Sequence, residues 1–207
     1  MKTPKITLVL LVLLVILGTT TAIAFVRPRS VAPPSSNLTG ELLVANRQLV
    51  DPNFAKCVIY VIAHSEDGAM GLIVNRVYGT MSLQEMLGAF GIETREKRKV
   101  ELYYGGPVEI RRGFVLHSGD YTGVSTLLLG KDMALSTGLD VMQAVAEGRG
   151  PERTRFLLGY AGWGAGQLEH ELARSDWLIA PADPSLIFSS DPGAVWEKAL
   201  QRAGIAL

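Results

Sequence analysis

The segment from residue 156 to residue 172 constrains the fold of this chain most strongly. It begins with the apolar run Phe156-Leu157-Leu158, which suits a buried strand, and then passes through glycines at positions 159, 162, 164 and 166. It ends as Gln167-Leu168-Glu169-His170-Glu171-Leu172, in which the two leucines share one helical face. The pattern predicts a strand, a glycine turn and a helix, in that order.

The glycine turn has two interpretations. Glycines there permit positive φ angles and the close approach of a ligand or another backbone. The start of the helix would also point unpaired N–H groups into the turn, which suits an anion or a carboxylate. Alternatively, the glycines only let Tyr160 and Trp163 pack against a neighbouring strand. The sequence leaves both interpretations open.

The composition and charge of the chain limit the kinds of partner that it can bind. The chain has 207 residues, of which 48% are hydrophobic and 19% charged, and this fits a globular core. The first 37 residues hold four lysines and arginines and no acid, so the remainder has sixteen basic against twenty acidic groups, a net charge of −4. A mildly acidic domain is a poor candidate for binding nucleic acid, because that affinity comes mainly from neutralising phosphates.

Residues 1–26 predict a signal peptide or a membrane anchor. A basic start precedes an apolar stretch, and a small-residue segment then ends in Ala22-Ile23-Ala24, which predicts cleavage after Ala24. The rival interpretation is an uncleaved anchor, because a helix from Ile6 to Val26 would span about 30 Å. In both cases we expect the segment to engage a membrane and place the protein in the cell envelope. Residues 27–37 predict an extended linker rich in proline and serine.

A single domain is expected over residues 38–207. Besides the strand that starts at residue 156, strands are predicted at residues 40–45, 57–63, 71–76, 100–104, 113–117, 124–129, 177–180 and 186–188. Ser82 and Glu85 predict a capping box for a helix whose apolar face runs from Leu83 to Phe90, and Leu139 and Met142 mark a second helix. Asp191 and Pro192 predict the start of the last helix. Sequential strands with irregularly placed helices indicate an α+β fold with a mixed, largely antiparallel sheet.

Several catalytic motifs can be excluded. Cys57 is the only cysteine, so the chain forms no internal disulfide, and its apolar surroundings predict a buried, inert thiol. The chain has no nucleophile elbow and no P-loop, and Arg174 stands where a zinc-binding H-E-x-x-H motif needs its second histidine. His117 and Ser118 are neighbours on a strand and therefore point to opposite faces. We predict no catalytic residue, no metal and no cofactor.

A candidate binding site lies where three predicted strands end, at residues 75–76, 105–107 and 163–167. If the sheet brings them together, they would form a concave site with a guanidinium, an amide, an aromatic face and free N–H groups, which suits a small anionic ligand or a protein partner's chain terminus. The alternative is that Arg76 pairs with Glu169 and the glycines serve packing. His64 is expected in a surface turn beside Glu66 and Asp67. The candidate residues are Asn75, Arg76, Gly105, Gly106, Pro107, Trp163, Gly164, Gly166 and Gln167.

Several ordered segments resemble the YqgE/AlgH family. The resemblance covers roughly residues 38–205 and implies a single α+β domain with a bifurcated, barrel-like sheet flanked by helices. It implies no mechanism, because the family is a bacterial group without an established biochemical activity. The matching segments are residues 38–40, 67–76, 105–108, 113–118 and 158–172, with Trp177 and residues 181–183.

The predicted function is that of a non-enzymatic binding or interaction domain at the membrane or cell envelope. The first alternative is an enzyme, such as a hydrolase, that uses a cleft formed by Asn75, Arg76 and Trp163. The second is a transcriptional regulator, which rests on the name of one family branch and which the charge disfavours. Members of the family usually start near the first strand and look cytoplasmic, so a cytoplasmic location is the alternative to the envelope.

Overall fold

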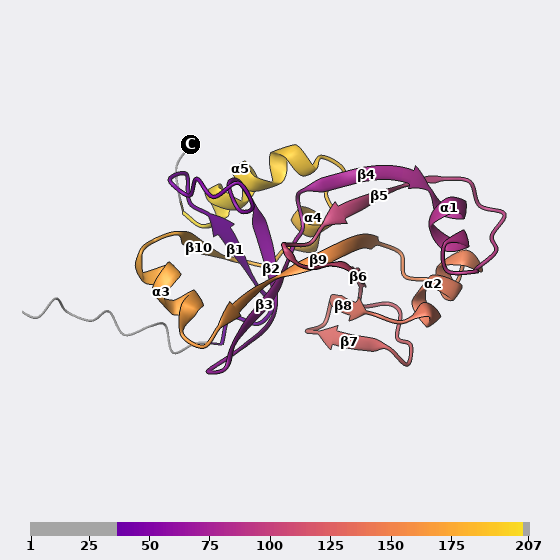
Figure 1. The fold of residues 1–207 in the computed structure, drawn as a ribbon, viewed down its shortest axis with the longest axis horizontal. Helices are drawn as coiled ribbons and strands as arrows, with labels where there is room; N and C mark the ends of the chain where they lie inside the picture. The colour runs from indigo at the N-terminus through magenta and orange to yellow at the C-terminus, as the bar shows by residue number, and fades with distance from the viewer. Residues whose placement is uncertain (1–36, 205–207) are drawn as a thin grey trace, which may run out of the picture. The chain divides into compact units, whose positions relative to one another are not determined.

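The computed structural model describes residues 37–204, and strand β9 (Thr154–Gly164) lies at the centre of its sheet (Figure 1). The second half of β9 pairs antiparallel with β3 (Gly68–Ile73). Its first half lies between β6 (Val108–Ser118), which is antiparallel to it, and β5 (Lys99–Tyr104), which is parallel to it. One strand therefore holds both parts of the sheet together.

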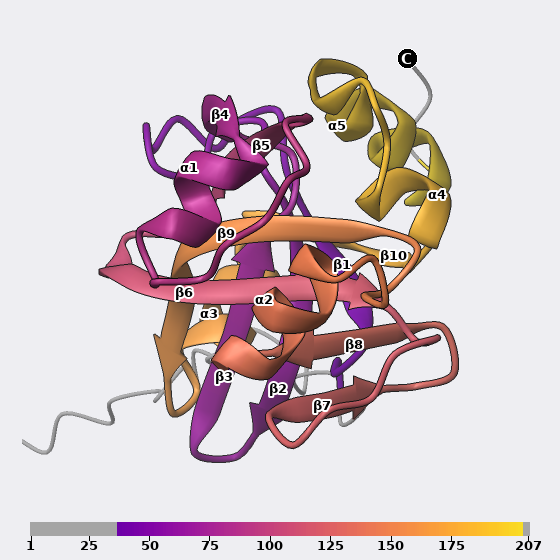
Figure 2. The ribbon, with the colours of Figure 1, turned by 90° about the vertical axis from the view of Figure 1, so that its right-hand side faces the viewer.

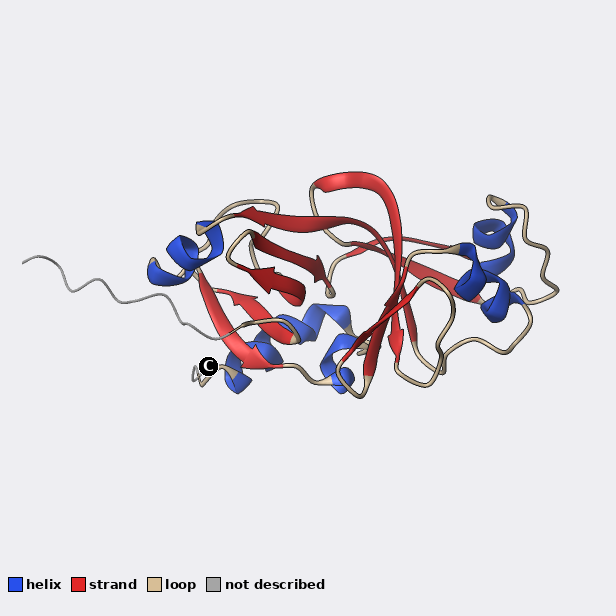
Figure 3. Ribbon diagram, turned by 90° about the horizontal axis from the view of Figure 1, so that it is seen from below, coloured by secondary structure: helices blue, strands red, loops and turns tan. Residues whose placement is uncertain are grey.

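The sheet has ten strands in the order β10-β1-β2-β3-β9-β6-β8-β7, with β4 attached through β5. It branches at β9, where β5 and β4 leave the main path, and its strands curl, as Figure 3 shows. Only the β5–β9 pairing is parallel among the described strands, and this confirms the predicted mixed, largely antiparallel and bifurcated α+β fold. The remaining strands are β1 (Glu41–Ala45), β2 (Val58–Ser65), β4 (Val77–Ser82), β7 (Thr126–Leu129), β8 (Met133–Ser136) and β10 (Trp177–Pro181).

Five helices flank the described part of the sheet: α1 (Leu83–Gly88), α2 (Leu139–Ala146), α3 (Gln167–Ala173), α4 (Pro184–Ile187) and α5 (Pro192–Arg202). Helices α1 and α2 lie next to each other and pack on Val115 and Phe156 (Figure 2). Helices α4 and α5 pack in a cluster with Leu116 and Leu157. Because neighbouring residues of a strand point to opposite faces, the two helix pairs cover opposite faces of β6 and β9.

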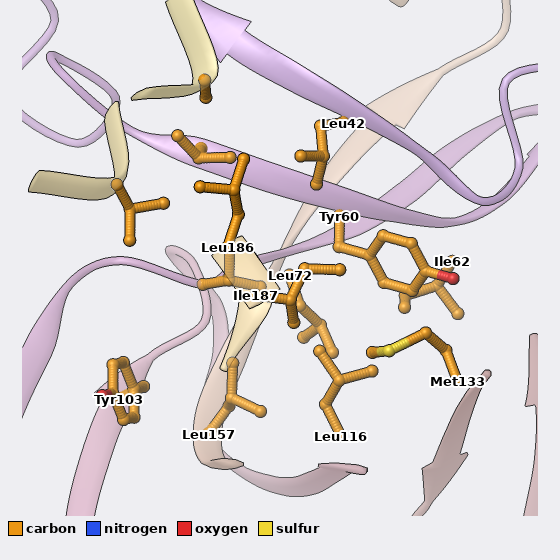
Figure 4. Packing of buried hydrophobic residues seen from close by; sticks show 14 of the residues in the cluster. Leu42, Tyr60, Ile62, Leu72, Tyr103, Leu116, Met133, Leu157, Leu186 and Ile187 are labelled. Carbon is orange, nitrogen blue, oxygen red and sulfur yellow. The ribbon is translucent and has the colours of Figure 1, made fainter. Parts of the chain in front are cut away.

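The main hydrophobic core lies between the sheet and helices α4 and α5 (Figure 4). Fully burying one large apolar side chain stabilises a fold by about 1.5–3 kcal/mol, so this cluster is a principal source of stability. Strand β2 is buried on both faces, as predicted, because Tyr60 belongs to this core and Ile59 to a second cluster with Trp163 and Trp177. Core residues labelled in Figure 4 include Leu42, Tyr60, Leu72, Leu116, Leu157, Leu186 and Ile187.

The predicted helix starts at Ser82 and Asp191 are confirmed. The backbone N–H of Glu85 donates to Oγ of Ser82 at 3.1 Å, and the Ser82 N–H donates to the Glu85 carboxylate at 2.9 Å, which completes the capping box. The carboxylate of Asp191 accepts from the N–H of Ala194, and Pro192 occupies the first turn of α5.

The predicted strand over residues 186–188 is wrong, because most of these residues form helix α4. The Asp183 carboxylate accepts from the N–H of Ser185 at 2.7 Å, and Pro184 stands at the helix start. These local signals outweigh the β-like composition of the short apolar run. Strands β4 and β8 were not predicted: β4 is mostly exposed and has no apolar alternation, and β8 is only four residues long.

The glycine turn is shorter than predicted. Strand β9 continues through Gly164, so Gly159, Gly162 and Gly164 belong to the strand, and the turn before α3 consists of residues 165–166. Helix α1 also ends earlier than expected, at Gly88, which leaves Phe90 51% exposed. Leu139, one of the apolar residues that marked the second predicted helix, is 54% exposed.

The predicted signal peptide or anchor and all but the last residue of the predicted linker lie outside the described residues. Between residues 37 and 204, no helix has the length and apolarity that crossing a membrane requires.

Candidate functional site

The structure brings two of the three predicted strand ends together. The N–H of Tyr104 donates to the carbonyl of Arg76 at 2.9 Å, and the N–H of Ile73 donates to the carbonyl of Gly105 at the same distance. Asn75 and Arg76 therefore lie beside residues 105–107, at the end of β3 where the sheet branches.

Arg76 uses its guanidinium to hold the turn at residues 51–56. Nη1 donates to the carbonyls of Pro52 and Asn53 at 3.1 and 2.9 Å, and Nη2 donates to the carbonyl of Ala55 at 3.1 Å. The guanidinium also lies over the ring of Tyr104, 5.8 Å from its centroid. Since these partners occupy much of the planar fork, Arg76 has an evident structural role. The expected alternative, a pair with Glu169, is not formed.

Asn75 closes the other side of the same turn. Its side-chain oxygen accepts from the N–H of Val58 at 2.8 Å, and its side-chain amide donates to the carbonyl of Lys56 at 2.9 Å. Both ends of the amide are thus engaged by backbone groups, and this joins the start of β2 to the end of β3.

Gly105 and Gly106 allow the chain to cross β9 at very close range. A Cβ atom on Gly105 would lie 2.2 Å from the carbonyl oxygen of Gly159, and one on Gly106 would lie 2.1 Å from the carbonyl carbon of Tyr160. Gly106 also has a φ of +151°, which L side chains rarely adopt. Here the glycines serve backbone packing, and Pro107, which follows them, is exposed.

Trp163 lies at the opposite end of β3 from Arg76. Gly164 pairs with Gly68, the first residue of β3, whereas Arg76 follows the last. A strand rises about 3.3 Å per residue, so most of the length of β3 separates the two side chains. The indole N–H of Trp163 and that of Trp177 both donate to the same carboxylate oxygen of Glu171, each at 2.8 Å. Trp163 is therefore fixed in the second cluster, away from the guanidinium.

The remaining candidates sit in the turn before α3. The N–H of Gly164, which was expected to meet an anion, donates to the side-chain oxygen of Gln167 at 3.1 Å. The side-chain amide of Gln167 donates in turn to Glu171 at 2.9 Å, and Gly166 adopts a left-handed φ of +71° as N-cap. The three strand ends do not share one concavity. Ligand binding by these residues stays a prediction.

His64 pairs with Glu169 and not with its sequence neighbours. Its Nε2 lies 2.7 Å from the carboxylate of Glu169, and its Nδ1 accepts from the N–H of Leu38 at 3.1 Å. Because Nδ1 accepts, the ring proton belongs to Nε2, which donates to the carboxylate. The pair joins the start of the domain to α3.

The described structure has an apolar cavity between α1 and α2, which we call the α1–α2 pocket. Its volume is about 320 Å³, and the sheet forms its floor through residues of β5, β6 and β9. Three methionines line it, and methionine side chains adapt their shape to irregular apolar partners. Other apolar walls come from Phe90, Leu102, Leu139 and Phe156, and the methionines are Met81, Met86 and Met142.

Arg111 supplies the positive charge of the α1–α2 pocket. Its side chain is exposed and lines the cavity, and it forms no ion pair with any residue between 37 and 204. The neighbouring Arg112, by contrast, pairs with Glu109 at 3.1 Å. A guanidinium beside an apolar cavity suits a ligand with an apolar body and an anionic end.

Ser136 and His117 form a buried hydrogen-bonded pair beside the pocket. Nδ1 of His117 lies 2.8 Å from the carbonyl of Ser118 and must donate to it, so the Ser136 hydroxyl donates to Nε2, at 2.9 Å. A nucleophile and its base make such a hydrogen bond. However, both side chains are 0% exposed, and Oγ1 of Thr126 lies 2.7 Å from the serine oxygen. Burial lowers the pKa of His117, and the pair forms part of a closed internal network.

The sequence interpretation missed both the α1–α2 pocket and the Ser136–His117 pair. The pair joins residues on two strands, and one of them, β8, was not predicted. A usable signal for the pocket was the excess of apolar residues at the ends of α1 and α2, because Phe90 and Leu139 have no core position to fill. Among the described residues, no group of histidine, cysteine or acidic side chains is placed to hold a metal ion.

Comparison with known proteins identifies the relatives of this chain. Residues 42–207 match the family DUF179, described as AlgH-like. A UPF0301 protein of Methylococcus capsulatus is 54% identical over 181 residues, which cover 87% of this chain and 100% of that protein. A UPF0301 protein of Rhodospirillum rubrum is 46% identical over 169 residues, which cover 81% of this chain and 88% of that protein.

Two solved structures share the fold. The solution structure of the AlgH protein from Pseudomonas aeruginosa has a TM-score of 0.69 and 41% identity, over 83% of this chain and 92% of that chain. A crystal structure of a protein from Corynebacterium diphtheriae has a TM-score of 0.64 over 79% of this chain and 85% of that chain, and its 22% identity shows the fold alone. The chain therefore belongs to the AlgH-like family, as the resemblance of its sequence segments predicted.

Proposed function

We propose that this domain is a non-enzymatic binding module that holds a small amphipathic carboxylate in the α1–α2 pocket. The observation that carries the proposal is a cavity of about 320 Å³ with apolar walls, lined also by Arg111, whose guanidinium has no carboxylate partner among residues 37–204. Small-molecule sites are typically concave, mostly apolar and equipped with few polar groups that orient the ligand. The volume lies at the lower end of the usual range for such sites, so we expect a short alkyl chain.

The apolar body of the ligand supplies most of the affinity. Burial of one methylene group is worth about 0.8 kcal/mol, which corresponds to about fourfold in the dissociation constant. The carboxylate of the ligand would face Arg111, and an exposed ion pair contributes only about 0.2–1 kcal/mol. Chain length therefore decides whether the ligand binds, and the charged end decides which way it points.

The test is calorimetric titration of the full chain with butanoate, hexanoate and octanoate. The proposal expects affinity to rise about fifteenfold for each pair of added methylenes until the cavity is full, because two methylenes are worth about 1.6 kcal/mol. Octanamide should bind about two- to fivefold more weakly than octanoate, since it has no charge to pair with Arg111. Affinity that does not depend on chain length would contradict the proposal.

A matched pair of glycine substitutions locates the site. A Cβ on Gly113 or on Gly79 meets no atom within 4 Å, so Gly113→Leu and Gly79→Leu place the same side chain on open strand positions. Gly113 lines the α1–α2 pocket and Gly79 does not. We expect Gly113→Leu to weaken octanoate binding at least about tenfold through occlusion, and Gly79→Leu to leave it within about twofold. Equal loss in both variants would place the ligand elsewhere.

A hydrolase that uses Asn75, Arg76 and Trp163 is the enzymatic alternative, and the geometry does not favour it. Hydrogen bonds tie the side chains of Asn75 and Arg76 to backbone groups, and Trp163 lies at the opposite end of β3, where it pairs with Ala69. Turnover of a panel of simple esters that is lost in Trp163→Ala would support this alternative.

Association with the cell envelope is the second part of the proposal, and it rests on the sequence of residues 1–26. Their basic start, apolar stretch and Ala22-Ile23-Ala24 ending match a secretory signal, and their length matches an anchor. Cell fractionation with mass measurement of the mature N-terminus tests this proposal. A full-length chain found only in the soluble cytoplasmic fraction would contradict it.

A further inference from the structure

A second cavity of the described structure is polar and basic. It lies between β5, the start of β9 and the chain that follows α4, and its volume is about 440 Å³. Four cationic and two acidic side chains line it, so its lining carries a net charge of +2 in a domain whose sequence is mildly acidic. We call it the basic pocket. Its charged residues are Arg98, Lys99, Arg153, Arg155, Glu101 and Glu152.

Arg155 is the buried member of this set, with 3% of its surface exposed. Its Nε donates to the carbonyl of Ile187, and its Nη2 donates to the carbonyl of Ser189 at 2.7 Å. The guanidinium lies 4.0 Å from the centroid of the Tyr103 ring. In the range from 37 to 204, no carboxylate forms an ion pair with Arg155.

A buried guanidinium without a carboxylate partner is costly, because neutral carbonyls only partly replace the water it has lost. Burial accordingly lowers the pKa of Arg155. The charge of Glu101 offsets part of this cost, but its carboxylate forms no ion pair with Arg155 and accepts the hydroxyl of Tyr103 instead. An anion in the basic pocket would supply the missing negative charge.

We propose that the basic pocket binds the phosphate group of a small phosphomonoester. Guanidinium groups match the oxygens of phosphate through parallel N–H donors, and lysine adds a compact charge. A phosphate anion complements the net positive charge of this lining, in which Arg98 is already paired with Glu96 at 2.7 Å and Lys99, Arg153 and Arg155 are not paired with a carboxylate of residues 37–204. Thr154 and Ser190 place hydroxyl-bearing residues in the same wall. The cavity has about 440 Å³, which leaves room for an organic substituent on the phosphate.

The basic pocket and the α1–α2 pocket share one lining residue, Phe156, and are otherwise lined by different residues. Arg155 and Phe156 are neighbours on β9 and point to opposite faces of the sheet. Arg155 lies on the face of the main core, where its guanidinium stacks on Tyr103, and Phe156 packs under α1 and α2. The phosphate proposal therefore does not depend on the carboxylate proposal, and each can fail alone.

The experiment is calorimetric titration of the full chain with inorganic phosphate, glycerol phosphate and acetate at low ionic strength. The expected result is that glycerol phosphate binds at least as tightly as inorganic phosphate and that acetate binds at least about tenfold more weakly. Absence of phosphate binding at millimolar concentration would overturn the proposal. If inorganic phosphate binds and glycerol phosphate binds about tenfold more weakly, the ligand is free phosphate and the phosphomonoester is ruled out.

Variants place the phosphate in the basic pocket. Lys99→Ala and Arg153→Ala remove exposed cations of the wall, and each should weaken binding of glycerol phosphate about five- to tenfold while the domain stays folded. Arg174→Ala is the matched control, because Arg174 is exposed, pairs with Asp176 and does not line this pocket. It should change the affinity by less than about twofold once ionic strength is fixed. Equal weakening in all three variants would indicate unspecific charge attraction and overturn the site.

The buried arginine needs a milder substitution. Arg155→Lys keeps the positive charge and removes the planar fork. We expect this variant to retain its fold, as judged by circular dichroism, and to bind glycerol phosphate at least about tenfold more weakly. A folded Arg155→Lys protein with unchanged affinity would show that the fork does not contact the ligand, and this would overturn the proposed role of Arg155.

Discussion

Replacing Arg76 with alanine tests whether this residue holds the turn at residues 51–56. The substitution removes the hydrogen bonds to the carbonyls of Pro52, Asn53 and Ala55 and the contact with the Tyr104 ring. The turn would then be held to the end of β3 by the side chain of Asn75, which donates to the carbonyl of Lys56.

The expected loss of stability can be worked out from these contacts. Two of the three hydrogen bonds are exposed, so water competes for them and each contributes about 0.5 kcal/mol. The bond to Ala55 is partly buried and contributes about 1 kcal/mol, and an exposed cation–π contact adds about 0.5 kcal/mol. Arg76→Ala should therefore lower the free energy of unfolding by about 2–3 kcal/mol, or Tm by roughly 5–10 °C.

Urea unfolding followed by tryptophan fluorescence measures this change. The free energy of unfolding in water is extrapolated for the wild type, Arg76→Ala, Arg76→Lys and Arg112→Ala. Lysine keeps the charge but offers a single donor group, so about half of the loss should remain. Arg112 has one exposed ion pair and a cation–π contact with the ring of Phe114 at 5.3 Å, so its replacement should cost about 1 kcal/mol or less. A loss below about 0.5 kcal/mol in Arg76→Ala would refute the structural role.

Further predictions concern backbone packing and titration. Gly106→Ala should lower the free energy of unfolding by more than about 3 kcal/mol or prevent folding, because its Cβ would meet backbone atoms at 2.1 Å. Gly79→Ala should keep a free energy of unfolding, measured in urea, within about 1 kcal/mol of the wild type. Burial raises the pKa of Cys57 to about 11 and those of Tyr60 and Tyr103 to about 12. As pH rises above about 9, the unfolded chain releases these three protons while the folded state keeps them. The free energy of unfolding is therefore unaffected by these groups below about pH 9 and is lower by about 5 kcal/mol at pH 11. Urea unfolding at pH 8 and at pH 11 measures this change, and equal free energies of unfolding at the two pH values would contradict it. Cys57→Ala should reduce the difference between the two pH values by about 2 kcal/mol. Cys57 should also react with a disulfide reagent at pH 8 at least about 100-fold more slowly than a free cysteine, and a rate close to that of the free thiol would show that it is accessible.

Local sequence signals predicted those parts of the fold that depend on neighbouring residues. The capping box of Ser82 and Glu85 and the Asp191-Pro192 start of α5 are local, and both are present. The helix at residues 184–187 was missed although its cap at Asp183 is equally local, because the apolar run Leu186-Ile187-Phe188 favoured a strand. The short, exposed strand β4 has no burial pattern of its own and forms through pairing with β5.

The candidate site depended on contacts between distant segments, and these were only partly predictable. The end of β3 and the residues after β5 do meet, as expected, because both approach β9. No local pattern indicated that the carbonyls of the turn at residues 51–56 would occupy the Arg76 guanidinium, or that the side chain of Gln167 would accept the N–H of Gly164. The α1–α2 pocket also depends on how two helices far apart in the chain come together over the sheet.

Methyl-labelled NMR of the full chain gives the most direct test of the proposed binding function. Met81, Met86 and Met142 line the α1–α2 pocket, whereas Met133 lies in the main core and Met70 packs against it. On addition of octanoate, we expect the ε-methyl signals of the three pocket methionines to shift with one common dissociation constant, while those of Met70 and Met133 stay in place. Unchanged signals from the pocket methionines at saturating octanoate, or shifts confined to Met70 and Met133, would contradict the account.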